Sequence, residues 1–245
     1  MASETFVKKD ALRRIICDIK ELRKNPLTSH GIHYEHDDTD MLKGRALIIG
    51  PADTPYADGF YLFKFQFPSN YPHAPPKVDF CTGDGYTRFN PNLYRTGKVC
   101  LSILNTWKGE PWSGCQTISS VLLAICTVFN AEPLLNEPGV TKTHQDYDSY
   151  NEIIRYKNID VAIFGMLAKI GGVCVTKNNE LCDISGNCVS EFAIFGDIMR
   201  EYFQKNKEKI RARVLEGCTI EYNINVYKMS VTTNYKRLMP KFDEF

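Results

Sequence analysis

Apolar residues between positions 11 and 24 recur every three or four positions. This spacing places their side chains on one face of a helix. The residues of this face are Leu12, Ile15, Ile16, Ile19 and Leu22. Asn25 and Pro26 follow directly, and a proline ring cannot continue a helix. The pattern predicts an amphipathic helix over residues 11–24.

The period changes to two over residues 60–67, which is typical of a strand. Aromatic side chains occupy every second position, at Tyr61, Phe63, Phe65 and Phe67. The pattern predicts a strand with one strongly aromatic face. Residues 46–49 and 77–81 are predicted as shorter strands, and the glycines and prolines of residues 50–59 indicate a hairpin. The stretch 29–40 is polar, contains three histidines and is not assigned to a strand.

A segment without a sustained period runs from residue 83 to residue 117 and contains both tryptophans. A long loop inside a compact domain is usually functional. Thr117, at the end of this segment, is expected to cap a buried helix that ends before Pro133.

Three more elements are predicted towards the C-terminus. Residues 147–169 have a helical pattern, with Gly171 and Gly172 as its stop. A longer helical pattern covers residues 190–216, and Gly217 ends it. Apolar and polar residues alternate over 220–226, which indicates an edge strand, although no partner strand is obvious.

The charge balance argues against nucleic-acid binding. The chain has 30 Lys and Arg residues against 29 Asp and Glu residues, a formal net charge of +1. This is far from the basic excess that binding to a phosphate backbone requires. No stretch has the pattern of a signal peptide or the length of a membrane span. We therefore expect a protein that binds neither nucleic acid nor membrane and lies in the cytoplasm, with the nucleus as an additional option.

The chain contains nine cysteines. Their number is odd and no secretory signal is seen, so reduced thiols are the better interpretation. Cys174, Cys182 and Cys188 lie eight and six positions apart, without a nearby histidine. A structural zinc at these cysteines is the less favoured interpretation, and no metal site is expected.

The most informative segment is residues 89–104, FNPNLYRTGKVCLSIL. Asn92 precedes Cys100 by eight positions, and Leu-Ser-Ile-Leu follows the cysteine. This resembles the active-site signature of ubiquitin-conjugating enzymes, in which a His-Pro-Asn box precedes a cysteine at that distance. Other pieces of the family pattern occur in the same order along the chain, at Gly50-Pro51, Tyr71-Pro72 and Trp112-Ser113. The resemblance covers residues 11–169, and a chance match of so many ordered pieces is remote.

The order of one helix, several strands and further helices indicates an α+β fold. The resemblance adds the details of the ubiquitin-conjugating (UBC) fold: an N-terminal helix, a four-stranded antiparallel meander sheet, a central helix and C-terminal helices. It implies a catalytic domain over residues 8–170. Residues 171–245 are expected to form a mainly helical C-terminal extension packed on this domain.

The resemblance also implies a mechanism. Cys100 accepts ubiquitin, or a ubiquitin-like protein, as a thioester by exchange from an activating enzyme, which needs only a thiolate fraction. Asn92 donates a hydrogen bond to the oxyanion that forms when an amine attacks the thioester; the alternative for Asn92 is a loop residue that bonds its own backbone. Tyr94, Leu101 and Ser102 shape a groove for the modifier's C-terminal tail. No cofactor is expected, because ATP is used by the activating enzyme.

Two positions depart from the family pattern. Asn90 replaces the family histidine, so any structural bond of the imidazole must be made by an amide, and no titration near neutral pH remains there. Glu137 is the nearest counterpart of an acidic residue that orients or deprotonates the acceptor lysine in many members, after a one-residue shift in the alignment. A solvated loop glutamate is the alternative. Asn90 and Glu137 are therefore candidates for support of the catalytic loop.

The expected partners follow from the same resemblance. They are ubiquitin or a ubiquitin-like protein, a ubiquitin-activating enzyme, a ubiquitin ligase and protein substrates. The chain is most similar to histidine-free members with a C-terminal extension, which are loaded by the second, less common activating enzyme. Basic residues of the N-terminal helix are expected to meet that enzyme, or else to form a solvated face; they are Arg13, Arg14, Lys20 and Arg23.

Three competing functions were weighed. A catalytically inactive scaffold of the same fold would bind ubiquitin without loading it, but such variants lack the cysteine. A cysteine peptidase needs a histidine as base, and the motif fits transfer better than hydrolysis. A pure interaction protein would leave the spacing of Asn92 and Cys100 unexplained.

Overall fold

The computed structural model describes residues 9–171 and 189–245. Four strands form an antiparallel meander in the order β1-β2-β3-β4, with bounds Ile32–His36, Lys43–Ile49, Phe60–Gln66 and Lys77–Phe80. The register pairs Ile32 with Ile48, Ile49 with Phe60, and Phe63 with Phe80. The expected meander sheet is confirmed.

The first strand, β1, lies in the polar stretch 29–40, for which no strand was predicted. Only Ile32 of this strand is fully buried. An edge strand pairs on one side only, and its exposed positions accept polar residues, so no alternating apolar pattern marks it.

The aromatic face of β3 forms the centre of the core. Tyr61, Phe63 and Phe65 are each no more than 2% exposed. Phe129, at the end of α2 (Ile118–Val128), stacks on Tyr61 with ring centroids 4.4 Å apart. Burial of such rings contributes on the order of 2 kcal/mol each. The predicted aromatic strand is thus the surface on which α2 packs.

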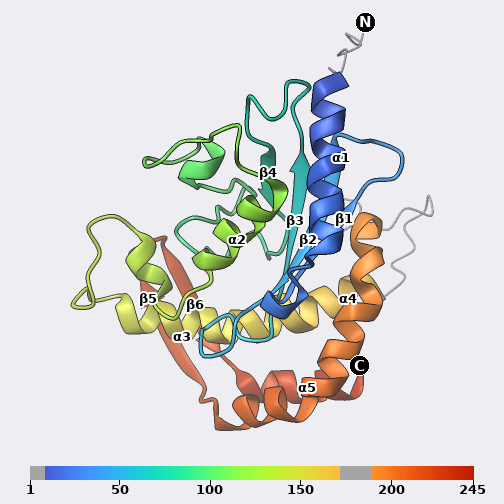
Figure 1. Ribbon diagram of the computed structural model, residues 1–245. Coiled ribbons are helices and arrows are strands. Elements are labelled where there is room, and N and C mark those ends of the chain that lie inside the picture. The colour runs from blue at the N-terminus through green and yellow to red at the C-terminus, as the bar shows by residue number, and fades with distance from the viewer. Residues whose placement is uncertain (1–8, 172–188) are drawn as a thin grey trace, which may run out of the picture.

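The N-terminal helix, α1 (Lys9–Lys24), lies beside the sheet (Figure 1). Ile15 is buried as predicted, but Ile16 is 41% exposed. Consecutive residues point about 100° apart on a helix, so one of the two must leave the core face. Arg14 also differs from the expected basic face, because it bonds to Asp18 and to the carbonyls of Gly114 and Gln116.

The loop of residues 83–117 ends where Thr117 caps α2, as predicted. The Thr117 hydroxyl accepts a hydrogen bond from the Ser120 N–H, and the Ser120 hydroxyl accepts one from the Thr117 N–H. This reciprocal pair is a capping box, which satisfies backbone groups that a helix start leaves without partners.

The helix predicted over residues 147–169 is longer and has a widened middle. It consists of α3 (Tyr147–Lys157), a π-helical segment (Asn158–Gly165) and α4 (Met166–Gly171). Asn158, at the start of the widened segment, is buried and bonds to Tyr61 and to the Ala57 carbonyl. Single π turns often occur where a side chain has a specific role. Gly171 is the last residue of α4, and Gly172 lies outside the described residues.

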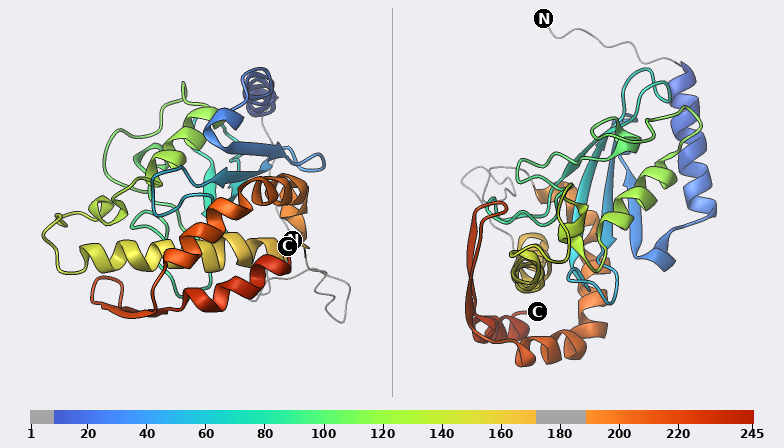
Figure 2. Two further views of the ribbon diagram at one scale, coloured as in Figure 1. Left: turned by 90° about the horizontal axis from the view of Figure 1, so that it is seen from below. Right: turned by 90° about the vertical axis from the view of Figure 1, so that its left-hand side faces the viewer.

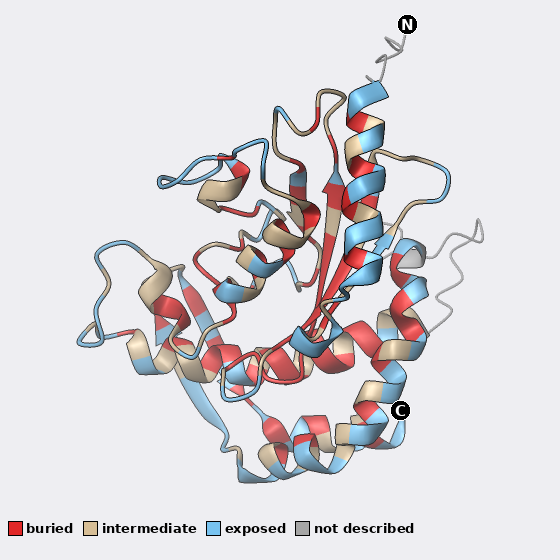
Figure 3. Cartoon of the chain, viewed as in Figure 1, coloured by how far each residue is buried: buried red, intermediate tan, exposed pale blue. Residues whose placement is uncertain are grey.

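The C-terminal extension surrounds this long helix (Figure 2). A 3₁₀ segment (Val189–Phe195) leads into α5 (Gly196–Glu216), then come β5 (Ile220–Ile224), β6 (Met229–Thr233) and a last 3₁₀ segment (Tyr235–Asp243). Asp160 bonds to Arg237 and Lys241 of the last segment, at 2.8 Å each. Figure 3 shows buried residues along the long helix. Phe164 of this helix packs on Phe203 and Phe242 of the extension, with ring centroids 5.8 and 4.9 Å away, so the extension shares a core with the domain. The predicted domain boundary near residue 170 stays a prediction.

The edge strand predicted over residues 220–226 is β5, and it pairs with β6. This partner was not evident from the sequence. Its buried residues Met229, Val231 and Thr233 alternate with exposed ones, but serine and threonine made this alternation weak. Gly217 ends α5 as expected; a Cβ there would lie 2.3 Å from the Tyr235 ring, so close packing requires the glycine.

Asp58 joins the β2–β3 loop to α5. It is 2% exposed and accepts hydrogen bonds from Tyr202 at 2.8 Å and from Arg213 at 2.6 Å. Its backbone is left-handed, with φ of 64°, a conformation that asparagine and aspartate tolerate best after glycine.

Asp58→Asn is expected to lower the free energy of unfolding by about 3 kcal/mol, because Arg213 would lose its buried counter-charge. Urea unfolding measures this change. Asp53→Asn is the matched control, because Asp53 lies in the same loop with φ of 60° but is exposed. Equal urea midpoints for the two variants would show that the Asp58 bonds contribute nothing.

Candidate active site

Residues 92–100 form a closed loop that ends at the candidate nucleophile, Cys100. The Cys100 N–H donates to the Asn92 carbonyl at 2.8 Å, and Asn92 Nδ2 donates to the Cys100 carbonyl at 2.7 Å. Between them, Leu93 pairs with Val99 in a short bridge. The eight-residue spacing seen in the sequence is therefore the length of a loop whose two ends bond to each other.

The Asn92 amide has a second N–H, which is not needed for the bond to the Cys100 carbonyl. Asn92 is half-buried, while Cys100 is only 2% exposed. The Asn92 side chain is bonded to the backbone of Cys100. Its second N–H is therefore placed to donate to the carbonyl oxygen of an acyl group on the Cys100 sulfur. The same bond also fits the alternative, in which Asn92 supports the loop.

Asn90 lies beneath this loop and is completely buried. Its Nδ2 donates to the Tyr56 hydroxyl at 2.8 Å and to the Val128 carbonyl at 3.0 Å. Its Oδ1 accepts from the Asn92 N–H at 2.9 Å and from Asn136 at 3.3 Å. All four hydrogen-bonding positions of the amide are used. The Asn90 side chain thus connects Asn92 to the β2–β3 loop, to the end of α2 and to the segment that follows α2. An amide does not titrate, so these bonds do not depend on a protonation state of residue 90.

Asn90→Ala is expected to destabilise the protein by about 2 kcal/mol, because it leaves buried polar groups without partners. Thermal unfolding followed by circular dichroism measures the loss. Asn25→Ala is the control, since Asn25 is exposed at the end of α1 and its amide bonds to Glu21. Unchanged stability of the Asn90 variant would mean that water replaces these bonds at no cost.

Glu137 follows the 3₁₀ segment Pro133–Asn136, directly after the asparagine that bonds to Asn90. It is half-buried, and its carboxylate accepts a hydrogen bond from Tyr227 of the extension. This differs from the alternative of a solvated loop glutamate. Tyr227 could not be predicted from the sequence, because no local pattern relates residues ninety positions apart.

The three residues predicted for the modifier-tail groove are not collected in one described pocket. The Tyr94 ring lies 3.4 Å from the Arg88 guanidinium. Leu101 and Ser102 are half-buried at the start of the segment Ser102–Leu104. Their role in a groove stays a prediction.

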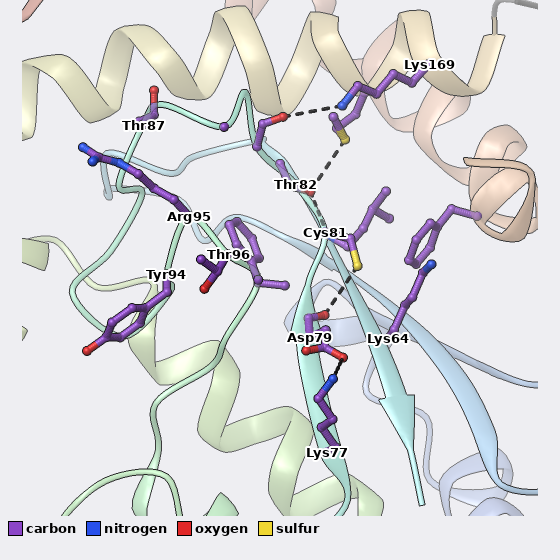
Figure 4. A pocket seen from close by; sticks show the side chains of 17 residues that line it. Lys64, Lys77, Asp79, Cys81, Thr82, Thr87, Tyr94, Arg95, Thr96 and Lys169 are labelled. Carbon is purple, nitrogen blue, oxygen red and sulfur yellow. Dashed lines mark hydrogen bonds and ion pairs between the residues drawn. The ribbon is translucent and has the colours of Figure 1, made fainter. Parts of the chain in front are cut away.

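A cavity of about 440 Å³ lies beside the loop but is not lined by Cys100 or Asn92 (Figure 4). Its lining includes Lys64, Lys77 and Lys169. Two of these cations already have partners, since Lys64 pairs with Glu191 at 3.1 Å and Lys77 with Asp79 at 2.7 Å.

Cys81 also lines this cavity. Burial raises the pKa of the Cys81 thiol to about 12, so this thiol keeps its proton at neutral pH and is a poor nucleophile. Burial also raises the pKa of Cys126. Both thiols are therefore poor candidate acceptors. Within residues 9–171 and 189–245, no histidine forms a hydrogen bond with Cys100, as a peptidase base would.

In the described parts of the chain, no group of three or more His, Cys, Asp or Glu residues is placed to hold a metal ion. Cys174, Cys182 and Cys188 lie outside the described residues. No described helix is long and apolar enough to cross a membrane.

The meander sheet, its helices and a cysteine held by an asparagine eight residues earlier define an α+β domain with a candidate thiol acceptor site. Residues 14–158 match the family model "Ubiquitin-conjugating enzyme". The match covers more than half of the chain, which therefore belongs to the ubiquitin-conjugating enzyme family. The family and the UBC fold predicted from the sequence are both confirmed.

Several curated relatives are similar to this chain. "Ubiquitin-conjugating enzyme E2 Z" of Homo sapiens is 48% identical over 159 residues, which cover 64% of this chain and 44% of the human protein. "Dual E2 ubiquitin-conjugating enzyme/E3 ubiquitin-protein ligase BIRC6" of Homo sapiens is 46% identical over 128 residues, covering 48% of this chain and 3% of that protein. "Probable ubiquitin-conjugating enzyme E2 R521" of Acanthamoeba polyphaga mimivirus is 35% identical and covers 67% of this chain and 12% of that protein.

Within the family, the chain is thus similar to E2 Z, as its motifs indicated. It spans about half the length of the E2 Z proteins that it matches. All three relatives described above are named as conjugating enzymes, so they give no support to the inactive-scaffold alternative.

Proposed function

We propose that this chain is a ubiquitin-conjugating enzyme that carries ubiquitin, or a ubiquitin-like modifier, as a thioester on Cys100. The reciprocal hydrogen bonds between Asn92 and Cys100 carry this proposal. They hold an amide donor beside the one cysteine that the family motif marks.

In the loading step, the Cys100 thiolate attacks the thioester carbonyl carbon of the modifier on the activating enzyme. The bond to the activating enzyme's sulfur breaks and that sulfur leaves as the thiolate, so one thioester replaces another at little free-energy cost. This chain therefore needs no ATP of its own, because the activating enzyme has already used it.

In the transfer step, an amine of a protein substrate, or a ligase cysteine, attacks the thioester carbonyl. Negative charge develops on the carbonyl oxygen, and the second N–H of Asn92 stabilises it. The Cys100 thiolate then leaves. Tyr94, Leu101 and Ser102 contact the C-terminal tail of the modifier. The proposed place of the reaction is the cytoplasm or the nucleus.

The activating enzyme is expected to be the second, less common one, and α1 is the surface proposed to meet it. Arg13, Lys20 and Arg23 of this helix are exposed. Arg14 is left out of this surface because its guanidinium bonds within the fold.

A loading assay tests the proposed function. The purified chain is incubated with ATP, ubiquitin and each of the two activating enzymes in turn, and the products are separated on a non-reducing gel. A heavier species that reductant removes is expected, with the second activating enzyme as the better donor. Absence of this species with both enzymes, and with a ubiquitin-like modifier as cargo, would refute the function.

A further inference from the structure

The tip of the β5–β6 hairpin, residues 225–228, is bound to the catalytic domain from two sides. Asp146, which is 4% exposed, accepts hydrogen bonds from the N–H groups of Asn225 at 2.9 Å and Val226 at 2.8 Å. Arg95, in the loop between Asn92 and Cys100, donates to the Tyr227 carbonyl at 2.7 Å. Figure 1 shows the hairpin beside α3, extending towards the loop that joins α2 to α3. The extension therefore reaches the candidate active site.

Tyr227 has an unfavourable backbone conformation at this tip. Its φ is 94°, and the next residue, Lys228, also has a positive φ of 48°. A positive φ is unfavourable for a bulky residue, and such conformations are common at functional sites. Glycine would remove the cost, but it would also remove the tyrosine side chain.

The Tyr227 side chain joins two parts of the site. Its hydroxyl donates a hydrogen bond to Glu137 Oε2. Its ring lies 5.2 Å from the Arg88 guanidinium. The Tyr94 ring stacks on the same guanidinium. Arg88 in turn donates to the carbonyls of Asn90 at 3.1 Å and Pro91 at 2.7 Å. Tyr227 thus connects Glu137 to the segment that carries Asn92.

The bond to Glu137 persists across the working pH range. Burial raises the pKa of Tyr227 well above its ordinary value, and the bond to Glu137 adds to this shift. The phenol therefore stays protonated at neutral and moderately alkaline pH and remains a hydrogen-bond donor. Tyr227 binds Oε2. Among the residues that the structure describes, the other carboxylate oxygen, Oε1, has no hydrogen-bond donor, so it can accept a proton or an N–H group.

We propose that Tyr227, from the extension, is a positioning residue that holds Glu137 towards the amine acceptor during transfer. The inference rests on the proposed function. The amine nitrogen bonds to the thioester carbonyl carbon, the carbon–sulfur bond breaks, and Cys100 leaves as the thiolate. The proton lost by the amine passes to Glu137 and from there to water. Transfer to a thiol needs no such base, so the extension specifically promotes transfer to amines.

Tyr227→Phe tests this role, because it removes the hydroxyl and keeps the ring over Arg88. The full chain is loaded with ubiquitin, the activating enzyme is stopped, and loss of the thioester is timed with free lysine or with β-mercaptoethanol as acceptor. We expect discharge to lysine at pH 7 to slow by about ten-fold, a part of what a positioned base contributes. The deficit should shrink towards pH 9.5, where more of the amine is already deprotonated. Loading and discharge to β-mercaptoethanol should not change.

Tyr222→Phe is the matched control. Tyr222 is half-buried in the same hairpin, and within the described residues its hydroxyl forms no hydrogen bond, so this variant should behave as the wild type. Glu137→Gln should slow discharge to lysine at least as much as Tyr227→Phe, and the double variant should be no slower than Glu137→Gln, because Tyr227 acts through Glu137.

Three results would overturn the inference. They are a normal or faster discharge to lysine, an equal slowing with both acceptors or at every pH, and independent effects of the two substitutions in the double variant. A wild-type chain that cannot be loaded would refute the proposed function itself, and this is seen before any discharge is timed.

Discussion

Cys100→Ser is expected to eliminate the reductant-sensitive ubiquitin adduct completely. Serine keeps the backbone N–H and carbonyl that bond to Asn92, so the loop is retained while the sulfur is lost. A serine hydroxyl is a weak nucleophile without an adjacent base. Any product that it forms is an oxygen ester, which reductant does not cleave. A non-reducing gel run with and without reductant distinguishes the two products.

Cys126→Ser serves as the matched control for this experiment. Cys126 lies in α2 as a half-buried thiol whose pKa burial raises, so its loss should leave loading intact. A reductant-sensitive adduct on the Cys100 variant would show that another cysteine is the acceptor. The exposed thiols Cys17, Cys115 and Cys218 would then be replaced one at a time.

Asn92→Ala is expected to slow transfer of ubiquitin to lysine by about 10²–10³-fold, the usual effect of removing one oxyanion donor. Loading should be affected much less, because a thiolate attacks a thioester more readily than an amine does, so the exchange relies less on this donor. Single-turnover discharge of the loaded chain measures the transfer step, and a short incubation with the activating enzyme measures loading.

The alternative role of Asn92 predicts a different result. If its amide only supports the loop through the bond to the Cys100 carbonyl, the alanine variant will be less stable and will load poorly as well as transfer poorly. Equal losses in both steps, together with a lower melting temperature, would therefore assign Asn92 to loop support.

The two variants also separate the chemistry from the extension. Cys100 carries the thioester itself, so its replacement should abolish discharge to every acceptor. Tyr227 acts through Glu137, and its effect should appear only with amine acceptors.

The sequence determined the elements whose residues are buried in a regular pattern. The amphipathic helix α1, the aromatic strand β3 and the Thr117-capped helix α2 were all predicted, because burial imposes a period on the residues of each element. Asn92 and Cys100 were named as site candidates because their spacing resembles the family signature, and a loop that closes on itself fixes such a spacing. Their catalytic roles stay predictions. Strand β1 was missed because an edge strand buries too little to impose such a pattern.

Only the tertiary structure decided how the extension meets the site. Tyr227 and Glu137 are ninety residues apart, and Asp58 and Arg213 are 155 apart. Contacts at such separations depend on the path of the whole chain, which no local period or spacing records. The same holds for Asn90, whose four bonds come from Tyr56, Asn92, Val128 and Asn136. An asparagine can replace the family histidine there because the fold brings two acceptors and two donors around a single buried amide.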